Sequence, residues 1–184
     1  MSLPRIVVLG AGLGGTIAAY EIREASKGKA EVMVISDQEN YWFVPSNPWV
    51  AVRWREPEAI CVHLPPVMKR KGIDFTAVGA KRVHPKENQV ELNDGAFVDY
   101  DYLVIATGPK LAFDEIEGFG PEANTVSVCA TDHAAAAADA FDRFCENPGP
   151  IVVGAAQGAS CYGPAYEFAL ILHTELKRRK LRDR

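Results

Sequence analysis

A glycine-rich loop near the start of the chain, residues 10–15 (GAGLGG), fits the G-x-G-x-x-G pattern of dinucleotide-binding loops. A predicted strand, Arg5–Leu9, precedes the loop and a predicted helix follows it. At such a junction Gly10 permits a tight turn, Gly12 lets the backbone approach a pyrophosphate, and Gly15 lets helix and strand pack closely. Free N–H groups at the helix start would bind the phosphates. The loop therefore predicts a dinucleotide site, but it does not distinguish FAD from NAD.

A second predicted strand, Glu31–Ile35, completes a β-α-β unit and implies a parallel sheet with a right-handed crossover. In such units an acidic residue at the end of the second strand usually binds the adenosine ribose. Here Ser36 occupies that place and Asp37 follows it. We expect Ser36 to hydrogen-bond the ribose. Asp37 either belongs to the same site or caps the following turn.

Four cysteines are spread widely along the chain: Cys61, Cys129, Cys145 and Cys161. They include no CxxC pair, so neither a disulfide scaffold nor a metal site is predicted. Cys145 is expected on the apolar face of a helix, in the protein core, and no role is predicted for Cys61.

Cys161 lies at the start of the last predicted helix, after a predicted strand at 151–153. The helix dipole and the free N–H groups of a helix start would favour its thiolate, which is the nucleophilic form. The alternative is a buried structural cysteine, because free cysteine is among the most buried residue types.

The composition indicates a globular protein, with 48% hydrophobic and 24% charged residues among 184. A formal net charge of −4 gives no reason to expect nucleic acid as a partner, although the C-terminal end is basic. Neither a membrane span nor a signal peptide is predicted.

Further elements follow from the patterns of apolar residues, prolines and glycines. The segment 38–54 is rich in aromatic residues and proline, too irregular for a helix and expected to line a site. The other predicted elements are a helix at 65–71 ended by Gly72, a third parallel strand at 74–78, antiparallel hairpins over 81–102 with a turn at 93–95, a central strand at 102–106, an alanine-rich helix at 132–145, and a closing helix at 163–180.

The apolar strand that ends in Ala106-Thr107-Gly108 after an antiparallel meander resembles the second FAD motif of the flavin disulfide reductase superfamily, so FAD is the expected dinucleotide. Three longer blocks, at 43–50, 106–113 and 158–167, resemble those of bacterial sulfide:quinone oxidoreductases. The resemblance covers nearly the whole chain. It implies an α/β fold with a Rossmann-like FAD-binding domain at 1–113 (parallel sheet plus antiparallel β-meander), a connecting segment with a helix at 114–150, and the first strand and helix of a truncated second dinucleotide-binding-like domain at 151–184.

In that family, sulfide is oxidised at redox-active cysteines beside the flavin, and FAD passes the electrons to a membrane quinone. The resemblance implies that Cys161 is the cysteine nearest the flavin, that Cys129 is a second redox cysteine and that His133 assists. The family's third cysteine would lie beyond Arg184. The expected cofactor-binding residues are Gly10, Gly12, Gly14, Gly15, Ser36, Asp37, Pro45, Asn47, Ala80, Thr107, Gly108 and Lys110.

Within that set, Pro45 and Asn47 are expected to form a rigid wall against the isoalloxazine ring, and Lys110 to place positive charge near the reduced flavin. The resemblance also implies a peripheral membrane protein whose membrane contact lies in a C-terminal part, and it allows a homo-oligomer.

A second glycine fingerprint is incomplete, because Gly154, Ala156 and Ala159 occupy its three positions. A methyl group at Ala156 disfavours close approach of a pyrophosphate, and hence tight binding of NAD(P)H. One strand and one helix cannot bury both faces of a parallel sheet, so we expect an N-terminal piece of a longer enzyme that is inactive alone. The alternatives are a flavin subunit of a sulfide dehydrogenase that reduces a cytochrome, an FAD/NADH-type quinone reductase, and a flavin-binding module without activity.

Overall fold

The computed structural model describes residues 2–159 and 161–183, and these residues form two compact units. The first unit contains the residues up to Trp42 together with Cys61–Leu111. The second contains Phe43–Ile60 and the residues from Ala112 onward. The division differs from the predicted segments, because Phe43–Ile60 belongs with the later part of the chain and not with the rest of 1–113.

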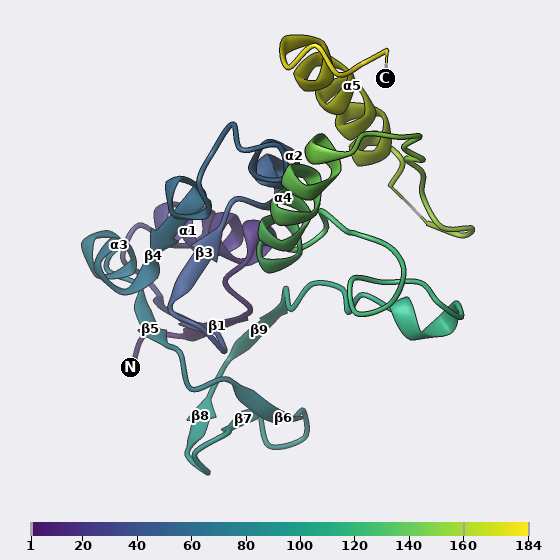
Figure 1. The fold of residues 1–184 in the computed structure, drawn as a ribbon. Coiled ribbons are helices and arrows are strands. Elements are labelled where there is room, and N and C mark those ends of the chain that lie inside the picture. Colours follow the sequence, from purple (N-terminus) through teal and green to yellow (C-terminus); the bar gives the residue numbers. More distant parts are fainter. Residues whose placement is uncertain (1, 160, 184) are drawn as a thin grey trace. The chain divides into compact units, whose positions relative to one another are not determined.

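The first unit is built on a four-stranded parallel sheet with the order β5-β2-β1-β9 (Figure 1). Its strands are β1 (Arg5–Leu9), β2 (Glu31–Ile35), β5 (Asp74–Thr76) and β9 (Tyr102–Ile105). The register pairs Leu9 with Ile35 on one side and with Ile105 on the other. The strand ends that precede the glycine loop and the Ala106-Thr107-Gly108 motif therefore lie side by side.

Two helices cover one face of this sheet: α1 (Leu13–Ser26) and α3 (Leu64–Lys71). Val8, Val32 and Val34 point to this face and pack against helical residues such as Ala19 and Met68. Gly72 ends α3 in the left-handed conformation, with φ of 65°, as predicted. The predicted β-α-β unit is thus confirmed.

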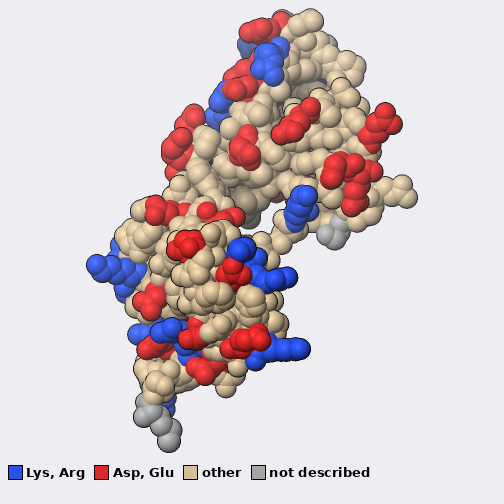
Figure 2. All heavy atoms as spheres, turned by 90° about the horizontal axis from the view of Figure 1, so that it is seen from below, with Lys and Arg blue, Asp and Glu red and all other residues tan. Residues whose placement is uncertain are grey.

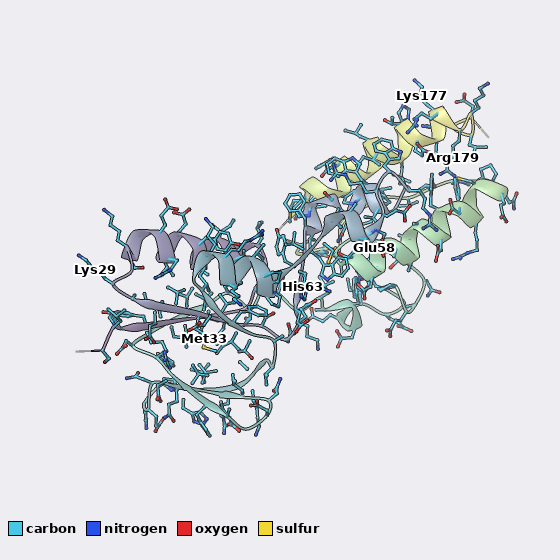
Figure 3. All side chains as sticks on the ribbon, turned by 90° about the vertical axis from the view of Figure 1, so that its left-hand side faces the viewer. Lys29, Met33, Glu58, His63, Lys177 and Arg179 are labelled. Atoms are coloured by element: carbon cyan, nitrogen blue, oxygen red, sulfur yellow. The ribbon has the colours of Figure 1, made fainter. Side chains whose placement is uncertain are left out.

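The opposite face of the sheet carries the antiparallel meander of β6 (Ala80–His84), β7 (Gln89–Leu92) and β8 (Phe97–Asp99). Because side chains alternate along a strand, Val7 and Leu9 point to this face and pack against Val90 and Leu92. Met33, labelled in Figure 3, joins this cluster from β2. A small two-stranded sheet of β3 (Asn40–Trp42) and β4 (Cys61–His63) completes the unit.

Two predictions about strands are wrong. The strand predicted as central is β9, which lies at an edge of the described sheet, with Tyr102 64% and Ile105 67% exposed. The strand predicted at 151–153 is not formed, and Val152 is 96% exposed. A strand needs a hydrogen-bonded neighbour, and in the described part of the chain 151–153 has none.

The second unit is mainly helical, with α2 (Asn47–Val50), α4 (Thr131–Glu146) and α5 (Gly163–Arg178), and short 3₁₀ turns at η1 (Val44–Ser46), η2 (Pro57–Ile60) and η3 (Phe113–Glu115). The segment predicted to be too irregular for a helix therefore contains the one-turn helix α2. Val52, Phe141, Ile171, Leu172 and Leu176 form the core of the unit.

A network of charges links the three helical regions of the second unit. Arg53 contacts Asp142 at 3.0 Å, and the indole N–H of Trp54 donates to Glu175 at 2.7 Å. Arg179, which directly follows α5 and is labelled in Figure 3, donates to Glu175 at 2.8 Å. The segment that carries α2 is thereby held to both α4 and α5.

On the surface, Lys and Arg side chains are interspersed with Asp and Glu over the face seen in Figure 2. None of the described helices is long and apolar enough to cross a membrane. Residues 2–159 and 161–183 contain no group of three or more His, Cys, Asp or Glu side chains that could hold a metal ion.

Candidate functional site

The glycine loop packs against the end of β9. Gly10 has φ of +95°, which L side chains rarely adopt, and its N–H donates to the carbonyl of Ile35 at 2.8 Å. A Cβ atom on Gly10 would lie 2.3 Å from the carbonyl oxygen of Ala106 and 3.0 Å from Cα of Thr107. The glycine loop, which predicts a dinucleotide site, and the Ala106-Thr107-Gly108 motif, which indicates FAD, are nearly a hundred residues apart in the sequence but are in contact in the fold.

The other glycines of the loop fall into two kinds. A Cβ atom on Gly15 would lie 1.9 Å from the carbonyl oxygen of Gly10, so the start of α1 can approach the loop only with glycine here. At Gly12 and Gly14 a Cβ atom would meet nothing within 4 Å. The space beside these two glycines is open, as a bound group requires.

The N-terminus of α1 is suited to a diphosphate. Its N-cap residue, Gly12, makes no side-chain cap hydrogen bond, and the first turn contains no acidic residue. The N–H groups of that turn and the positive end of the helix dipole are thus not neutralised by protein side chains. This observation fits the pyrophosphate of a dinucleotide.

The two predicted ribose-binding residues at the end of β2, Ser36 and Asp37, differ in burial. Ser36 is only 5% exposed, and its hydroxyl oxygen accepts a hydrogen bond from the N–H of Gln38 at 3.3 Å. Ser36 thus caps the turn, a role that the sequence allows for Asp37. Asp37 itself is exposed, so its carboxylate is the group at this position that is free to meet a ribose.

A further glycine, which lies outside the G-x-G-x-x-G pattern, brings a second loop close to Asp37. Gly79 has φ of +82°, and a Cβ atom there would lie 3.5 Å from Cα of Asp37 and 2.5 Å from Nδ2 of Asn93. The amide of Asn93 donates to the carbonyl of Val78 at 3.0 Å. The predicted site residue Ala80 follows directly, at the start of β6. A single glycine between a predicted strand and a predicted hairpin was the signal for this close approach.

The remaining predicted residues of the first unit follow β9. Thr107, Gly108 and Lys110 are all exposed. Gly108 has φ of +73°, and a Cβ atom there would meet nothing within 4 Å. The first unit thus brings together the glycine loop, the β2 end, the Gly79 turn and the Ala106-Thr107-Gly108 motif.

Pro45 and Asn47 belong to the second unit. Pro45 is exposed in η1. Asn47 is 0% exposed, and both polar atoms of its side chain are bound within the chain. Its Nδ2 donates to the carbonyl of Val128 at 3.0 Å, and its Oδ1 accepts from the hydroxyl of Thr131 at 3.1 Å. The amide of Asn47 is therefore committed to the chain itself.

The two cysteines with a predicted redox role are both free and exposed. Cys129 precedes α4, and its N–H donates to the hydroxyl of Ser127 at 3.1 Å. Cys161 lies two residues before α5, whose N-cap is Tyr162, and not inside the helix start. The alternative of a buried structural cysteine is contradicted for Cys161.

His133 lies in the first turn of α4, and its ring is 5.6 Å from that of Phe113, centroid to centroid. Its Nδ1 is buried and has no hydrogen-bond partner in the part of the chain that the structure describes. Cys145, by contrast, is partly buried against the core of the second unit, where Arg179 donates to its sulfur at 3.5 Å.

The parallel sheet with a glycine-rich loop between β1 and α1 is the arrangement of a Rossmann-like dinucleotide-binding domain. The chain belongs to the pyridine nucleotide-disulphide oxidoreductase family, whose model matches residues 4–157. The predicted Rossmann-like fold is thereby confirmed.

Among the relatives, the chain is 42% identical over 177 residues to the sulfide-quinone reductase of Aquifex aeolicus strain VF5. The alignment covers 96% of this chain and 40% of that protein. The crystal structure of the sulfide:quinone oxidoreductase from Aquifex aeolicus superposes with a TM-score of 0.89, at 42% identity, over 97% of this chain and 41% of that one. The mitochondrial sulfide:quinone oxidoreductase of Dictyostelium discoideum is 29% identical over 129 residues, covering 64% of this chain and 26% of that protein.

The chain thus spans about 40% of the length of the Aquifex relative. The family and these relatives indicate an FAD-binding flavoprotein, in agreement with the open space at Gly12 and the uncapped start of α1.

Proposed function

We propose that the chain supplies the FAD-binding part and two sulfur-reactive cysteines of a sulfide:quinone oxidoreductase. The observation that carries this proposal is the likeness to the Aquifex enzyme, which extends over 97% of the chain with a TM-score of 0.89. It includes both units, and with them both exposed cysteines.

FAD would be held mainly by the first unit. Gly12, Gly14 and the first turn of α1 would bind the pyrophosphate, because the N–H groups there are uncapped. Asp37 would accept hydrogen bonds from the ribose. Thr107, Gly108 and Lys110 would meet the flavin end, where the cation of Lys110 would stabilise negative charge on the reduced ring.

The sulfur chemistry would take place at the cysteines of the second unit. When the Cys161 thiolate joins with HS⁻, one S–S bond forms, one proton and two electrons leave, and a cysteine persulfide anion remains. When FAD is bound, its isoalloxazine ring accepts the two electrons and delivers them to a quinone. Cys129 would supply a second thiolate that takes over the outer sulfur of the persulfide: a new S–S bond forms at Cys129 as the S–S bond at Cys161 breaks and the Cys161 thiolate leaves, with no net change of oxidation state. Both thiols are exposed, as contact with hydrosulfide requires.

His133 would take up the proton released from hydrosulfide. Its Nδ1 has no partner among the described residues, and its ring packs against that of Phe113. An imidazole can accept a proton near neutral pH. We assign the quinone site and the membrane contact to the portion of the relatives that lies outside their alignment with this chain.

The proposal is tested on the full-length protein that contains this chain, by anaerobic titration of its FAD-loaded form with sodium sulfide, followed by a soluble quinone. We expect sulfide to bleach the flavin absorbance and the quinone to restore it. Bleaching by NADH with no response to sulfide would contradict the proposal and favour the NADH-type quinone reductase. Recovery with cytochrome c but not with quinone would favour the flavin subunit of a sulfide dehydrogenase.

A further inference from the structure

Asn47 occupies an unusual position for a polar side chain, because it is 0% exposed at the start of the one-turn helix α2. A buried amide is costly unless its donor and acceptor are both used. Here the donor reaches Val128 and the acceptor reaches Thr131, at 3.0 and 3.1 Å. Both partners lie more than eighty positions away in the sequence.

The two partners of Asn47 stand on either side of Cys129. Val128 directly precedes the cysteine, and Thr131 is the first residue of α4, whose first turn carries His133. We infer that Asn47 is a positioning residue, which fixes the backbone on both sides of Cys129 and the start of the helix that presents His133. This inference rests on the proposed function, because it gives the two residues a joint task in sulfur chemistry.

The chemistry of the side chain explains why asparagine stands here. The carbonyl of Val128 can only accept, so the atom facing it must be the NH₂ group, and this fixes the orientation of the amide. Aspartate would place a negatively charged oxygen against that carbonyl. Leucine would leave the carbonyl and the hydroxyl of Thr131 without a partner.

The segment around Cys129 depends on this contact. In the described part of the chain, the side-chain hydrogen bonds of residues 127–129 are otherwise local, such as the one from the N–H of Cys129 to Ser127. The segment that follows Asn47 is itself held in place, because Arg53 binds α4 and Trp54 binds α5. Asn47 therefore connects the backbone beside the exposed Cys129 to a firmly held part of the second unit.

The first test is amide hydrogen exchange of the FAD-loaded Asn47→Ala protein. The N–H of Ala134 donates to the carbonyl of Ala130 at 3.0 Å and so closes the first turn of α4. We expect this amide to exchange about tenfold faster in the variant, whereas the amides of the last turn of α4 keep their protection. The affinity for FAD should stay within about twofold. Unchanged exchange of the first turn would overturn the inference, and so would a loss of FAD affinity without loosening of α4, since that is the behaviour of a residue that contacts the flavin.

Two further variants keep the test decisive if Asn47→Ala does not fold. Thr131→Val removes one of the two hydrogen bonds and keeps the side-chain shape, whereas Thr131→Ser keeps the hydroxyl and should restore wild-type exchange. Asn40→Ala serves as a matched control, because Asn40 is an exposed asparagine in β3 of the first unit. Equal exchange in Thr131→Val and Thr131→Ser would overturn the inference.

A second experiment on the same variants measures the rate at which sulfide reduces the flavin. We expect about a tenfold slower rate in Asn47→Ala and Thr131→Val, and a normal rate in Thr131→Ser. If α4 loosens but the rate is unchanged, the positioning role is overturned although the contact is real. If the wild-type protein itself does not respond to sulfide, the proposed function fails, while hydrogen exchange still decides whether Asn47 holds the segment.

Discussion

The carbonyl oxygen of Ala106 lies 2.3 Å from the point that a Cβ atom on Gly10 would occupy. Contact at that distance is impossible, so the glycine loop and the end of β9 can meet only if residue 10 is glycine. The same contact sets the position of Thr107 and Gly108 beside the predicted phosphate site. It joins the two halves of the cofactor site through backbone atoms alone.

Gly10→Ala should therefore destabilise the protein even without cofactor. The methyl group would collide with Ala106, and the φ of +95° is strained for alanine. We expect a loss of about 2–4 kcal/mol in the free energy of unfolding, measured by urea denaturation of the cofactor-free protein. Gly149→Ala is the control, because a Cβ atom there meets nothing within 4 Å. Equal stability of the two variants would show that the loop can move away from β9.

Gly12→Ala should leave the stability nearly unchanged but weaken the binding of FAD. A Cβ atom there meets no protein atom within 4 Å, so the unfolding free energy should change by less than about 1 kcal/mol. The methyl group would instead enter the space predicted for the pyrophosphate, so the affinity for FAD should fall by at least about tenfold. Fluorescence titration with FAD measures this directly. Undiminished affinity would place the phosphates elsewhere.

At the end of β2, the exposed acid should matter more for the cofactor than the buried serine. Asp37→Ala should lower FAD affinity by about 10–100-fold, since a hydrogen bond to a charged group contributes about 1.5–3 kcal/mol. Ser36→Ala should mainly cost about 1 kcal/mol of stability, because it removes the hydrogen bond to the N–H of Gln38. The reverse ranking in a cofactor titration would restore Ser36 as the ribose ligand.

The buried carboxylate of Glu175 should make the second unit sensitive to acid. Burial acts to raise the pKa of Glu175, but hydrogen bonds from Arg179 and Trp54 outweigh it, and the pKa lies below its usual value of 4.5. A lowered folded-state pKa means that this carboxylate stabilises the fold above about pH 4.5 and that the contribution is lost as pH falls through the lower, folded-state pKa.

Glu175→Gln should remove that part of the acid sensitivity. At pH 7 the variant should be less stable by about 1–3 kcal/mol, because Arg179 loses the nearer of its two carboxylate partners, Glu175 at 2.8 Å, and keeps only Asp142 at 3.5 Å. Below pH 4 the difference from wild type should shrink. Urea denaturation at several pH values measures the two curves, and a difference that stays constant with pH would mean that another group dominates.

Much of the first unit was predictable from local patterns. The strands Arg5–Leu9 and Glu31–Ile35, helix α1 and the Gly72 helix end all follow from apolar periodicity and glycine placement, and the structure confirms them. The predicted turn at 93–95 is also confirmed, with Gly95 at φ of +88°. These features depend on neighbours in the sequence, which is why the sequence reveals them.

The features that the sequence did not predict depend on distant partners. An apolar run such as 151–153 indicates a strand, but whether it forms depends on a neighbouring strand that the run itself does not specify. Likewise, the exposed edge of β9 is a matter of sheet order. The sequence predicts that Asn47 lines the flavin site, but it does not indicate the partners of its buried amide, Val128 and Thr131, because these come close to Asn47 only in the fold.

Cys161 is proposed to be the thiol through which sulfide reduces the flavin. This role is measured by rapid anaerobic mixing of sodium sulfide with FAD-loaded wild-type, Cys161→Ala and Cys145→Ala forms of the full-length protein, followed by flavin absorbance and by peptide mass spectrometry. Cys145 is the matched control, because its sulfur is partly buried beside Arg179, whereas Cys161 is exposed. We predict that wild type and Cys145→Ala bleach and gain one sulfur atom on the Cys161 peptide, and that Cys161→Ala binds FAD but does not bleach. Bleaching of Cys161→Ala at the wild-type rate would show that sulfide reduces the flavin without Cys161.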